Sequence, residues 1–231
     1  MHSNNVTFKN IRVGPLQSFA GGIQFNGTDS YLSQTNNVIS PVNTAESISI
    51  WFKSSGGSFM GLGGTDRDYR TFYTLNDDLG RVDFEAWDDG SYHRVYSKDV
   101  TFEDNVYTHI VINRPTALTA YKDGVSIGNM TITYNIGSTT GFTASNFEIG
   151  RAPQPIVRND VYYEGTISNL TIDDGFTTAQ QAADLFNQGL NGSPMSVSGL
   201  NVKAWYPFQG DANDHSGNNH HFTTVNNVTF L

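Results

Sequence analysis

Short runs of alternating apolar and polar residues recur along the chain from Ile23 to Phe176, and each run is closed by Gly, Asn or Asp. A period of two is typical of β-strands that have one buried and one exposed face. Many such strands in one chain predict an all-β fold, a sandwich of two sheets whose core is built from residues 20–176.

Two runs carry more specific signals. In residues 43–53, Ile50 and Phe52 alternate with Trp51, so both faces hold an aromatic or aliphatic side chain. This pattern predicts a central strand that is covered on both faces. Asp123-Gly124 stands between two apolar runs, and this pair is typical of a two-residue hairpin turn.

One short helix is expected over residues 178–188, after the last strand of the core. Thr177 or Thr178 can cap its beginning, and Gly189 can end it. Its position in the chain predicts that it covers one end of the sandwich. Alternation returns in residues 200–231, which are expected to add a completing strand to one domain spanning residues 1–231.

Charge and composition argue against several classes of function. The chain has 231 residues, with 13 Lys and Arg against 22 Asp and Glu, a net charge of −9. No basic stripe is visible, which argues against nucleic-acid binding. No apolar run is long enough to cross a membrane, and the first residues lack the pattern of a signal peptide.

Cysteine is absent from the chain. Disulfides and thiolate metal sites are therefore excluded. Small secreted eukaryotic domains usually contain disulfides, so this absence favours a bacterial surface protein or a virus particle that assembles in a reducing cytoplasm.

Four motifs resemble, in the same order, those of the laminin-G-like jelly rolls of the concanavalin A-like lectin and glucanase superfamily. They are FNGTDSYL, ISIWFK, THIVINR with TAYKDGVSIG, and YEGTISNLTIDDGFTTAQQAADLFNQG, and they cover most of residues 20–190. The resemblance implies an antiparallel two-sheet jelly roll, of the kind found in phage or virion surface proteins and in bacterial adhesins.

The order of the last segment departs from this family. A segment resembling KAWYPFQGDANDHSGNNHHFTTVNNVTF usually precedes the FNGTDSYL strand, but here it follows it, and NNVTF occurs at both 4–8 and 226–230. The chain is then circularly permuted, is cut from tandem repeats, or donates its last strand to a neighbouring copy. We favour permutation with self-completion, the C-terminal strand taking the usual first-strand position, because an unpaired apolar strand promotes aggregation.

A structural Ca²⁺ at one rim of the sandwich is implied by the resemblance. The expected ligands are Gly27, Asp29, Asn169 and Asp173. Calcium takes six to eight oxygens, which a loop and a strand can supply together. Ser168 stands where the family has an acidic residue, and the alternative is that Asn26 and Asp29 only bond the backbone of their turn.

A second polar segment, residues 211–218, is rich in Asp and Asn but lacks the spacing of a calcium-binding loop. We interpret it as a turn held by its own side chains. His215, His220 and His221 are interpreted as exposed loop residues, because neighbouring strand residues point to opposite faces and two adjacent histidines cannot easily share one ion.

Glycan binding is the favoured chemistry for two neighbouring polar and aromatic stretches. A flat aromatic ring stacks on a sugar, and planar polar groups hold its hydroxyls. The candidate residues are Arg67, Tyr69, Arg70, Trp87, Asp88 and Tyr92. The alternative is that Trp87 belongs to the core and the charged residues form a solvated rim.

Catalysis is not expected. The E-x-D-x-x-E motif of the related glucanases is absent, and glycosidases need two carboxylates placed across the scissile bond. Asp83 and Glu85 alternate with apolar residues, as outward-facing charges on an ordinary strand would.

The sequence therefore predicts a non-catalytic binding or adhesion module at a virion surface or outside the cell, in a tail fibre or capsid decoration protein that recognises a cell-surface glycan. One alternative is a structural virion or oligomerisation protein without a small ligand. The other is a bacterial extracellular carbohydrate-binding domain or carbohydrate-active enzyme. Expected partners are a cell-surface glycan or other virion proteins, with a homotrimer as the expected oligomer.

Overall fold

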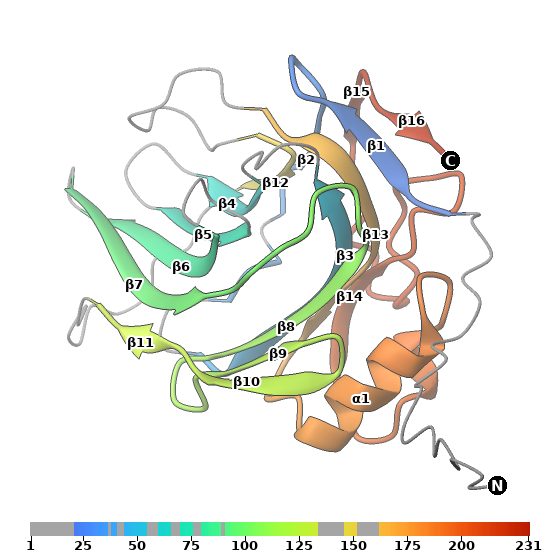
Figure 1. Ribbon diagram of the computed structural model, residues 1–231. Helices are drawn as coiled ribbons and strands as arrows, with labels where there is room; N and C mark the ends of the chain where they lie inside the picture. The colour runs from blue at the N-terminus through green and yellow to red at the C-terminus, as the bar shows by residue number, and fades with distance from the viewer. Residues whose placement is uncertain are drawn as a thin grey trace, which may run out of the picture.

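Two antiparallel sheets stack face to face, as the alternating pattern predicts (Figure 1). The computed structural model describes residues 21–36, 38–40, 44–54, 60–65, 70–75, 80–88, 91–133, 146–151 and 162–231. Of residues 60–65, 70–75, 85–88 and 91–95, it describes the backbone alone.

The first sheet, sheet A, runs in the order β10 (Val125–Asn129), β9 (Thr119–Lys122), β8 (Thr108–Arg114), β3 (Glu46–Ser54), β13 (Glu164–Asp173), β1 (Ile23–Asn26) and β16 (Thr229–Phe230), with β14 (Val202–Tyr206) also paired to β13. Sheet B runs in the order β11 (Thr131–Ile132), β7 (Ser91–Asp99), β6 (Arg81–Asp88), β5 (Arg70–Leu75), β4 (Met60–Thr65), β12 (Asn146–Ile149), β2 (Tyr31–Gln34) and β15 (Thr224–Asn226).

The hydrophobic core lies between the two sheets. Sheet A supplies Phe25 and Ile50, and sheet B supplies Phe84 and Phe147, and all of these side chains are buried. Full burial of one such side chain contributes about 1.5–3 kcal/mol. The all-β, antiparallel jelly-roll sandwich expected from the sequence is confirmed.

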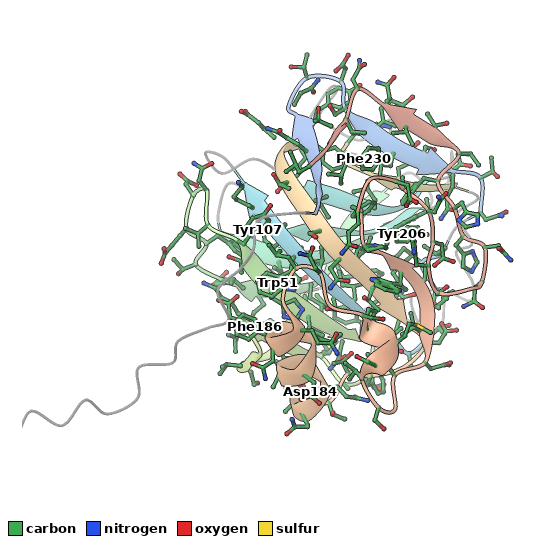
Figure 2. The ribbon with its side chains drawn as sticks, turned by 90° about the vertical axis from the view of Figure 1, so that its right-hand side faces the viewer. Trp51, Tyr107, Asp184, Phe186, Tyr206 and Phe230 are labelled. Carbon is green, nitrogen blue, oxygen red and sulfur yellow. The ribbon has the colours of Figure 1, made fainter. Side chains whose placement is uncertain are left out.

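The strand predicted to be central is β3, which lies between β8 and β13. Ile50 faces the core opposite Ile110 of β8, while Trp51 lies on the outer face and is only 2% exposed. The ring of Phe186 stacks on Trp51 at 5.4 Å (Figure 2). Both faces of β3 are therefore covered, as its aromatic residues indicated.

The predicted hairpin turn and the predicted ends of the helix are confirmed. Asp123 and Gly124 have φ of 50° and 74° and join β9 to β10, as a tight hairpin requires. Helix α1 (Ala179–Gln188) begins at Thr178, whose side chain accepts a hydrogen bond from the Gln181 N–H in a capping box, and it ends at Gly189.

Helix α1 does not cover an end of the sandwich, so that expectation is wrong. It packs on the outer face of sheet A, where Ala182 and Leu185 contact Val111 and Tyr121. The reason is that the outer face of the central strands is itself apolar, and an apolar sheet face must be buried against another element. The sequence showed that the helix has apolar residues, but it did not show that the outer face of sheet A is the surface that they bury.

The segment after α1 joins both sheets. Strand β14 pairs with β13, β15 pairs with β2 and β16 pairs with β1, so the C-terminus lies beside β1 (Figure 1). Tyr206, Phe208 and Phe222 of this segment are buried in the core. The chain therefore completes its own sandwich, while the circular permutation relative to the family stays a prediction.

Asp83 corrects one interpretation of the pattern. Its side chain is fully buried, with Arg81 Nε at 3.7 Å from its Oδ2, so it is not the solvated charge that the alternating pattern indicated. Strand β6 lies inside sheet B, so Asp83 is flanked by Thr74 of β5 and Ser97 of β7. Alternation indicates on which face of a strand a side chain lies, but it does not indicate whether other elements bury that side chain.

His109 is buried on the outer face of sheet A, where its ring centroid lies 5.0 Å from that of Trp51 and 6.1 Å from that of Phe186 of α1. Its Nε2 is 2.8 Å from Ser49 Oγ, and its Nδ1 has no hydrogen-bond partner among the described residues. Burial lowers the pKa of His109 from 6.5 to about 3. The imidazole is therefore neutral in the folded protein and gains a proton on unfolding at mildly acidic pH.

The pKa of His109 is lower in the folded protein than in the unfolded chain. The free energy of unfolding is therefore unaffected by this group above pH 6.5 and decreases progressively as the pH falls from 6.5 toward 3. We expect lowering the pH from 7 to 5 to reduce the free energy of unfolding by about 2 kcal/mol through this group. Urea denaturation of His109→Gln should show a correspondingly weaker pH dependence. The same substitution at exposed His215 is the control, and an equal change in both variants would contradict the assignment.

Candidate functional site

Three neighbouring strands of sheet B place aromatic and charged residues in register. Arg70 of β5 is opposite Trp87 of β6, and Trp87 is opposite Tyr92 of β7. Directly opposed residues on one face lie about 4.5–5.5 Å apart at Cβ. The three positions therefore form one continuous row across the sheet.

A second row runs beside the first. Phe72 of β5 is opposite Glu85 of β6, which is opposite Arg94 of β7. Residues two apart on a strand share a face, so the rows are adjacent. We call these six positions the sheet B array. It comprises Arg70, Phe72, Glu85, Trp87, Tyr92 and Arg94.

The array lies on the face of sheet B that is turned away from the core. Phe84 of β6 is in the core, and alternation puts positions 85 and 87 on the other face. The register of β6 and β7 shifts between Phe84 and Glu85, so that Val95 is an extra residue on β7. Without this bulge, positions 92 and 94 would fall on the core face.

Described side chains border the second row on its β12 side. Glu148 of β12 is opposite Gly63 of β4, which is opposite Phe72. Because Gly63 has no side chain, its position in the row between Glu148 and Phe72 consists of backbone alone.

Glu148 is held by Arg151, whose Nε donates to Glu148 Oε2 at 2.9 Å. Arg151 also lies over the ring of Tyr31, at 3.9 Å from its centroid. The hydrogen bond to Glu148 and the charge of Glu148 raise the pKa of the Arg151 guanidinium above its usual range, against the opposing effect of burial. This paired group forms a rigid, planar polar border to the array.

The predicted ligand-binding residues are partly brought together. Arg70, Trp87 and Tyr92 share a row, whereas Asp88 is one position further, opposite Ser91, and so alternates to the other face. Arg67 and Tyr69 lie outside the described residues.

Sequence reasoning missed Phe72, Glu85 and Arg94. Each is two residues from a predicted position on the same strand, so the period-two pattern could have found Phe72 and Glu85. Arg94 is found with Tyr92 by the same rule. The sequence alone does not reveal which strands pair or in which register, so it could not show that these positions lie side by side.

The four expected calcium ligands are not gathered. Gly27 and Asp29 lie by Glu164 at the beginning of β13, whereas Asp173 ends that strand. Nine residues of extended chain span about 30 Å. Asp29 also accepts hydrogen bonds on both oxygens, from Asn26 Nδ2 at 2.7 Å and Asn227 Nδ2 at 2.6 Å.

Asn169 and Asp173 have other surroundings. Asn169 Nδ2 donates to the Gly189 and Gly192 carbonyls, and its Oδ1 accepts from Trp205 Nε1 at 2.7 Å. Burial raises the pKa of Asp173 to about 6, against a hydrogen bond from the Asn201 N–H. These residues do not fit one calcium site together, and among the described residues no group of three or more His, Asp or Glu is placed to hold a metal.

Calcium binding as such stays a prediction. An ion that binds only the folded protein must raise its stability. Removal of a bound calcium ion by a chelator would therefore lower the melting temperature.

The turn around Asp214 is held as the sequence predicts. Asp214 accepts hydrogen bonds from the N–H groups of Trp205, Ser216 and His220, each at 2.9 Å. Burial alone would raise the pKa of Asp214, but these donors outweigh it and lower the pKa. The segment positions β14 against the core and is a structural turn.

Among the described residues, none of the helices has the length and apolar character needed to cross a membrane.

Comparison with known proteins agrees with this architecture. The model of the concanavalin A-like lectin/glucanases superfamily matches residues 26–183, more than half of the chain. No curated protein matches the sequence.

Similar solved structures share the fold at low sequence identity. The heptameric SAP-like pentraxin of Limulus polyphemus has 15% identity and a TM-score of 0.51, covering 79% of this chain and 91% of its own. The IT-sialidase CBM40 of Ruminococcus gnavus bound to alpha2,3 sialyllactose has 11% identity and a TM-score of 0.51, covering 72% and 96%.

Domain 4 of AbnA, a GH43 extracellular arabinanase from Geobacillus stearothermophilus, was solved in complex with arabinotriose. It has 13% identity and a TM-score of 0.50, covering 71% of this chain and 87% of its own. With the family match over residues 26–183 and the two-sheet architecture in agreement, the chain belongs to the concanavalin A-like lectin/glucanases superfamily.

Proposed function

We propose that this chain is a non-catalytic carbohydrate-binding module that binds a glycan on the sheet B array. The single observation that carries the proposal is the register of β5, β6 and β7, which sets Arg70, Trp87 and Tyr92 in one row. An aromatic platform bordered by planar charged groups is the chemistry that a sugar ring requires.

The size of the array supports one or two sugar rings. Strands lie about 4.8 Å apart, so three strands span about 10 Å across the sheet. Arg70 and Arg94 can donate paired hydrogen bonds to neighbouring hydroxyls or to a carboxylate. The position of Gly63 leaves room beside Phe72 for a part of the ligand to rest against the backbone.

Two structural neighbours support the same ligand class. One was solved with alpha2,3 sialyllactose and another with arabinotriose. Their identity to this chain is only 11% and 13%, so the likeness supports the fold alone. The choice of the ligand-binding face rests on the strand register of this chain.

The distribution of carboxylates favours binding over hydrolysis. Glycoside hydrolysis needs two carboxyl groups on either side of the scissile bond. The array contributes one acidic position, Glu85, and the nearby Glu148 is held by Arg151. We expect no release of reducing sugar from oligosaccharides that the protein binds.

Trp87→Ala tests the site directly. A biotinylated full-length chain, displayed multivalently on a glycan array, should bind a defined set of glycans. For the strongest of these, titration calorimetry should show at least a tenfold weaker affinity for Trp87→Ala, because loss of a stacked ring removes about 1.4 kcal/mol.

Phe176→Ala is the matched control. Phe176 is an exposed aromatic residue of the loop before α1 and lies outside the array. Its substitution should leave the affinity unchanged. Equal weakening by both variants, or unaltered binding by Trp87→Ala in a folded protein, would place the glycan elsewhere.

The biological setting follows from the sequence resemblance alone. We propose that the module is displayed on a virion surface, as part of a tail fibre or capsid decoration protein, where it would meet cell-surface glycans. A homotrimer, which would multiply a weak single-site affinity, is part of this proposal. Detection of the chain in purified virions would test the setting.

A further inference from the structure

The chain contains two Asn-Gly pairs, Asn26-Gly27 and Asn191-Gly192. In such a pair the main-chain nitrogen of the glycine can attack the side-chain carbonyl carbon of the asparagine, because glycine has no side chain that hinders the approach. The reaction needs both groups to be free to meet in the correct geometry. The structure gives the two pairs different surroundings, although both asparagines are exposed.

Both reacting groups of Asn26-Gly27 are held by hydrogen bonds. Gly27 donates its N–H to the Tyr163 carbonyl at 3.0 Å. Asn26 Oδ1 accepts hydrogen bonds from three main-chain N–H groups of its own turn at 2.9–3.2 Å, and Asn26 Nδ2 donates to Asp29 Oδ1 at 2.7 Å. These hydrogen bonds fix the amide and the glycine nitrogen, so they must break before the two groups can react.

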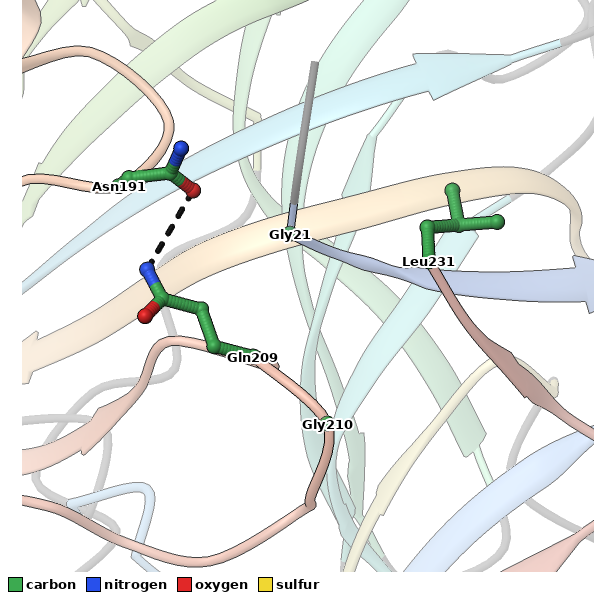
Figure 3. A pocket seen from close by; sticks show the side chains of 5 residues that line it. All are labelled: Gly21, Asn191, Gln209, Gly210 and Leu231. Carbon is green, nitrogen blue, oxygen red and sulfur yellow. Dashed lines mark hydrogen bonds between the residues drawn. The ribbon is translucent and has the colours of Figure 1, made fainter. Parts of the chain in front are cut away.

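The reacting groups of Asn191-Gly192, in the loop after α1, are held less firmly. Among the described residues, the Asn191 side chain makes a single hydrogen bond, in which Gln209 Nε2 donates to Asn191 Oδ1 at 3.3 Å (Figure 3). Gly192 N lies 3.5 Å from the Gly189 carbonyl oxygen, beyond the usual length of such a bond. Asn191 also borders a pocket of about 480 Å³, which is large enough to admit water.

The loop that carries Asn191 is anchored through its carbonyl groups. Asn169 Nδ2 donates to the Gly192 carbonyl at 2.9 Å, and Ser168 Oγ donates to the Leu190 carbonyl at 3.1 Å. These bonds hold the loop on sheet A, but they engage neither the Asn191 amide nor the Gly192 nitrogen. The anchors therefore do not protect the two groups that react.

Packing against the end of α1 requires a glycine after Asn191. A Cβ atom at Gly192 would lie 2.2 Å from Gln188 Cβ and 2.8 Å from the Gln188 carbonyl oxygen. Both distances are too short for real atoms, so no larger residue fits at position 192 without a shift of the main chain. The reactive Asn-Gly pair is therefore a consequence of how this loop packs.

We propose that Asn191 is a site of spontaneous deamidation and that the fold protects Asn26 from the same reaction. The Gly192 nitrogen loses its proton and bonds to Asn191 Cγ, the Cγ–Nδ2 bond breaks, and ammonia leaves with that proton. A five-membered imide ring remains, and one water molecule opens it. Attack of water at Cγ gives aspartate, and attack at the main-chain carbonyl carbon gives isoaspartate.

Either product changes the loop. A neutral amide becomes a carboxylate, so the net charge of −9 becomes more negative by one. In isoaspartate the main chain also gains one atom between residues 191 and 192, which displaces the Leu190 and Gly192 carbonyls from their partners on β13. The domain therefore acquires with time a second, more acidic form with an altered loop.

Peptide mapping of the full-length protein tests the proposal. The folded protein is incubated at neutral pH, digested under mildly acidic conditions that suppress further reaction, and analysed by mass spectrometry at both Asn-Gly pairs. We expect Asn191 to convert at least about tenfold faster than Asn26, because the hydrogen bonds around Asn26 must first open locally. Isoaspartate should accompany aspartate at residue 191.

Denaturation is the control for the local sequence. In urea, where neither pair is held by the fold, the two asparagines should convert at similar rates. Equal rates in the folded protein, or faster conversion of Asn26, would contradict the proposal. So would an Asn191 that stays intact in the folded protein while it converts in urea, since the fold would then protect both pairs.

Asn191→Gln gives an independent readout. Ion-exchange chromatography of the unaltered protein should show a more acidic peak that grows during incubation. Glutamine keeps the amide, but its additional methylene group disfavours ring closure, so this peak should be lost in the variant. Asn187→Gln is the matched control, at an exposed asparagine of α1 that glutamine follows, and it should leave the peak unchanged. An acidic peak that grows equally in Asn191→Gln would place the reaction at another residue and overturn the proposal.

Discussion

Tyr206→Ala is expected to lower the free energy of unfolding by about 4 kcal/mol. The side chain of Tyr206 is fully buried, and its ring packs against Phe147 of sheet B and against Phe208 and Phe222 of the C-terminal segment, with centroids 4.8–6.3 Å apart. Truncation leaves a cavity where two parts of the chain meet, and it leaves the His220 carbonyl without the hydroxyl that donates to it at 2.7 Å.

Urea denaturation followed by intrinsic fluorescence measures this loss. Tyr206→Phe keeps the ring and removes the hydroxyl alone, so it should cost about 1 kcal/mol. If Tyr206→Ala cost no more than Tyr206→Phe, residues 200–231 would not be part of the core. The sandwich would then be complete without them.

Glu46→Leu is expected to destabilise the protein by about 4 kcal/mol, because it leaves a buried guanidinium without its carboxylate. Glu46 and Arg114 are fully buried and face one another across β3 and β8, where they form an ion pair. Glu46 also accepts from the Ser40 N–H at 2.6 Å, and Arg114 lies 4.4 Å from the centroid of the Phe84 ring. The pair thus ties a loop and both sheets together.

Replacing both partners tests this explanation. Glu46→Leu with Arg114→Met removes both charges and should be more stable than Glu46→Leu alone, since an apolar pair needs no compensation for lost hydration. Glu103→Leu, at an exposed glutamate, should change stability by less than about 0.5 kcal/mol. A double variant as unstable as the sum of its two single variants would show that the buried charges act independently.

Much of the fold follows from local patterns. The alternation in residues 43–53 predicted a strand with two covered faces, and Asp123-Gly124 predicted a hairpin, because period and turn chemistry are set by neighbouring residues. The capping residue Thr178 and the terminator Gly189 were readable for the same reason. Such signals need no knowledge of distant contacts.

The candidate site was predicted less completely. Trp87, Arg70 and Tyr92 were chosen by residue type, but their common row depends on pairing between β5, β6 and β7 and on the extra residue Val95. A one-residue change of register moves every side chain to the other face of the sheet. The residue types therefore suggested glycan binding, whereas the strand register determined which residues share one face of sheet B.

Two errors have the same origin. The cover over the outer face of sheet A, and the burial of Asp83 inside sheet B, depend on which elements meet after the chain has folded. The expected calcium ligands are also separated in the fold, since Gly27 lies by Glu164 at the beginning of β13 and Asp173 ends that strand. The family resemblance implied that these residues share one site, and the length of the strand separates them.

From the amino-acid sequence came the strands, their turns, the capped helix and the membership of a lectin-like sandwich family, because these depend on short-range periodicity and local backbone preference. Packing in three dimensions determined the position of α1, the outward row on sheet B and the closure of both edges by residues 226–230. The physical reason is that strand pairing and burial join residues far apart in the chain, and many registers satisfy the same local pattern.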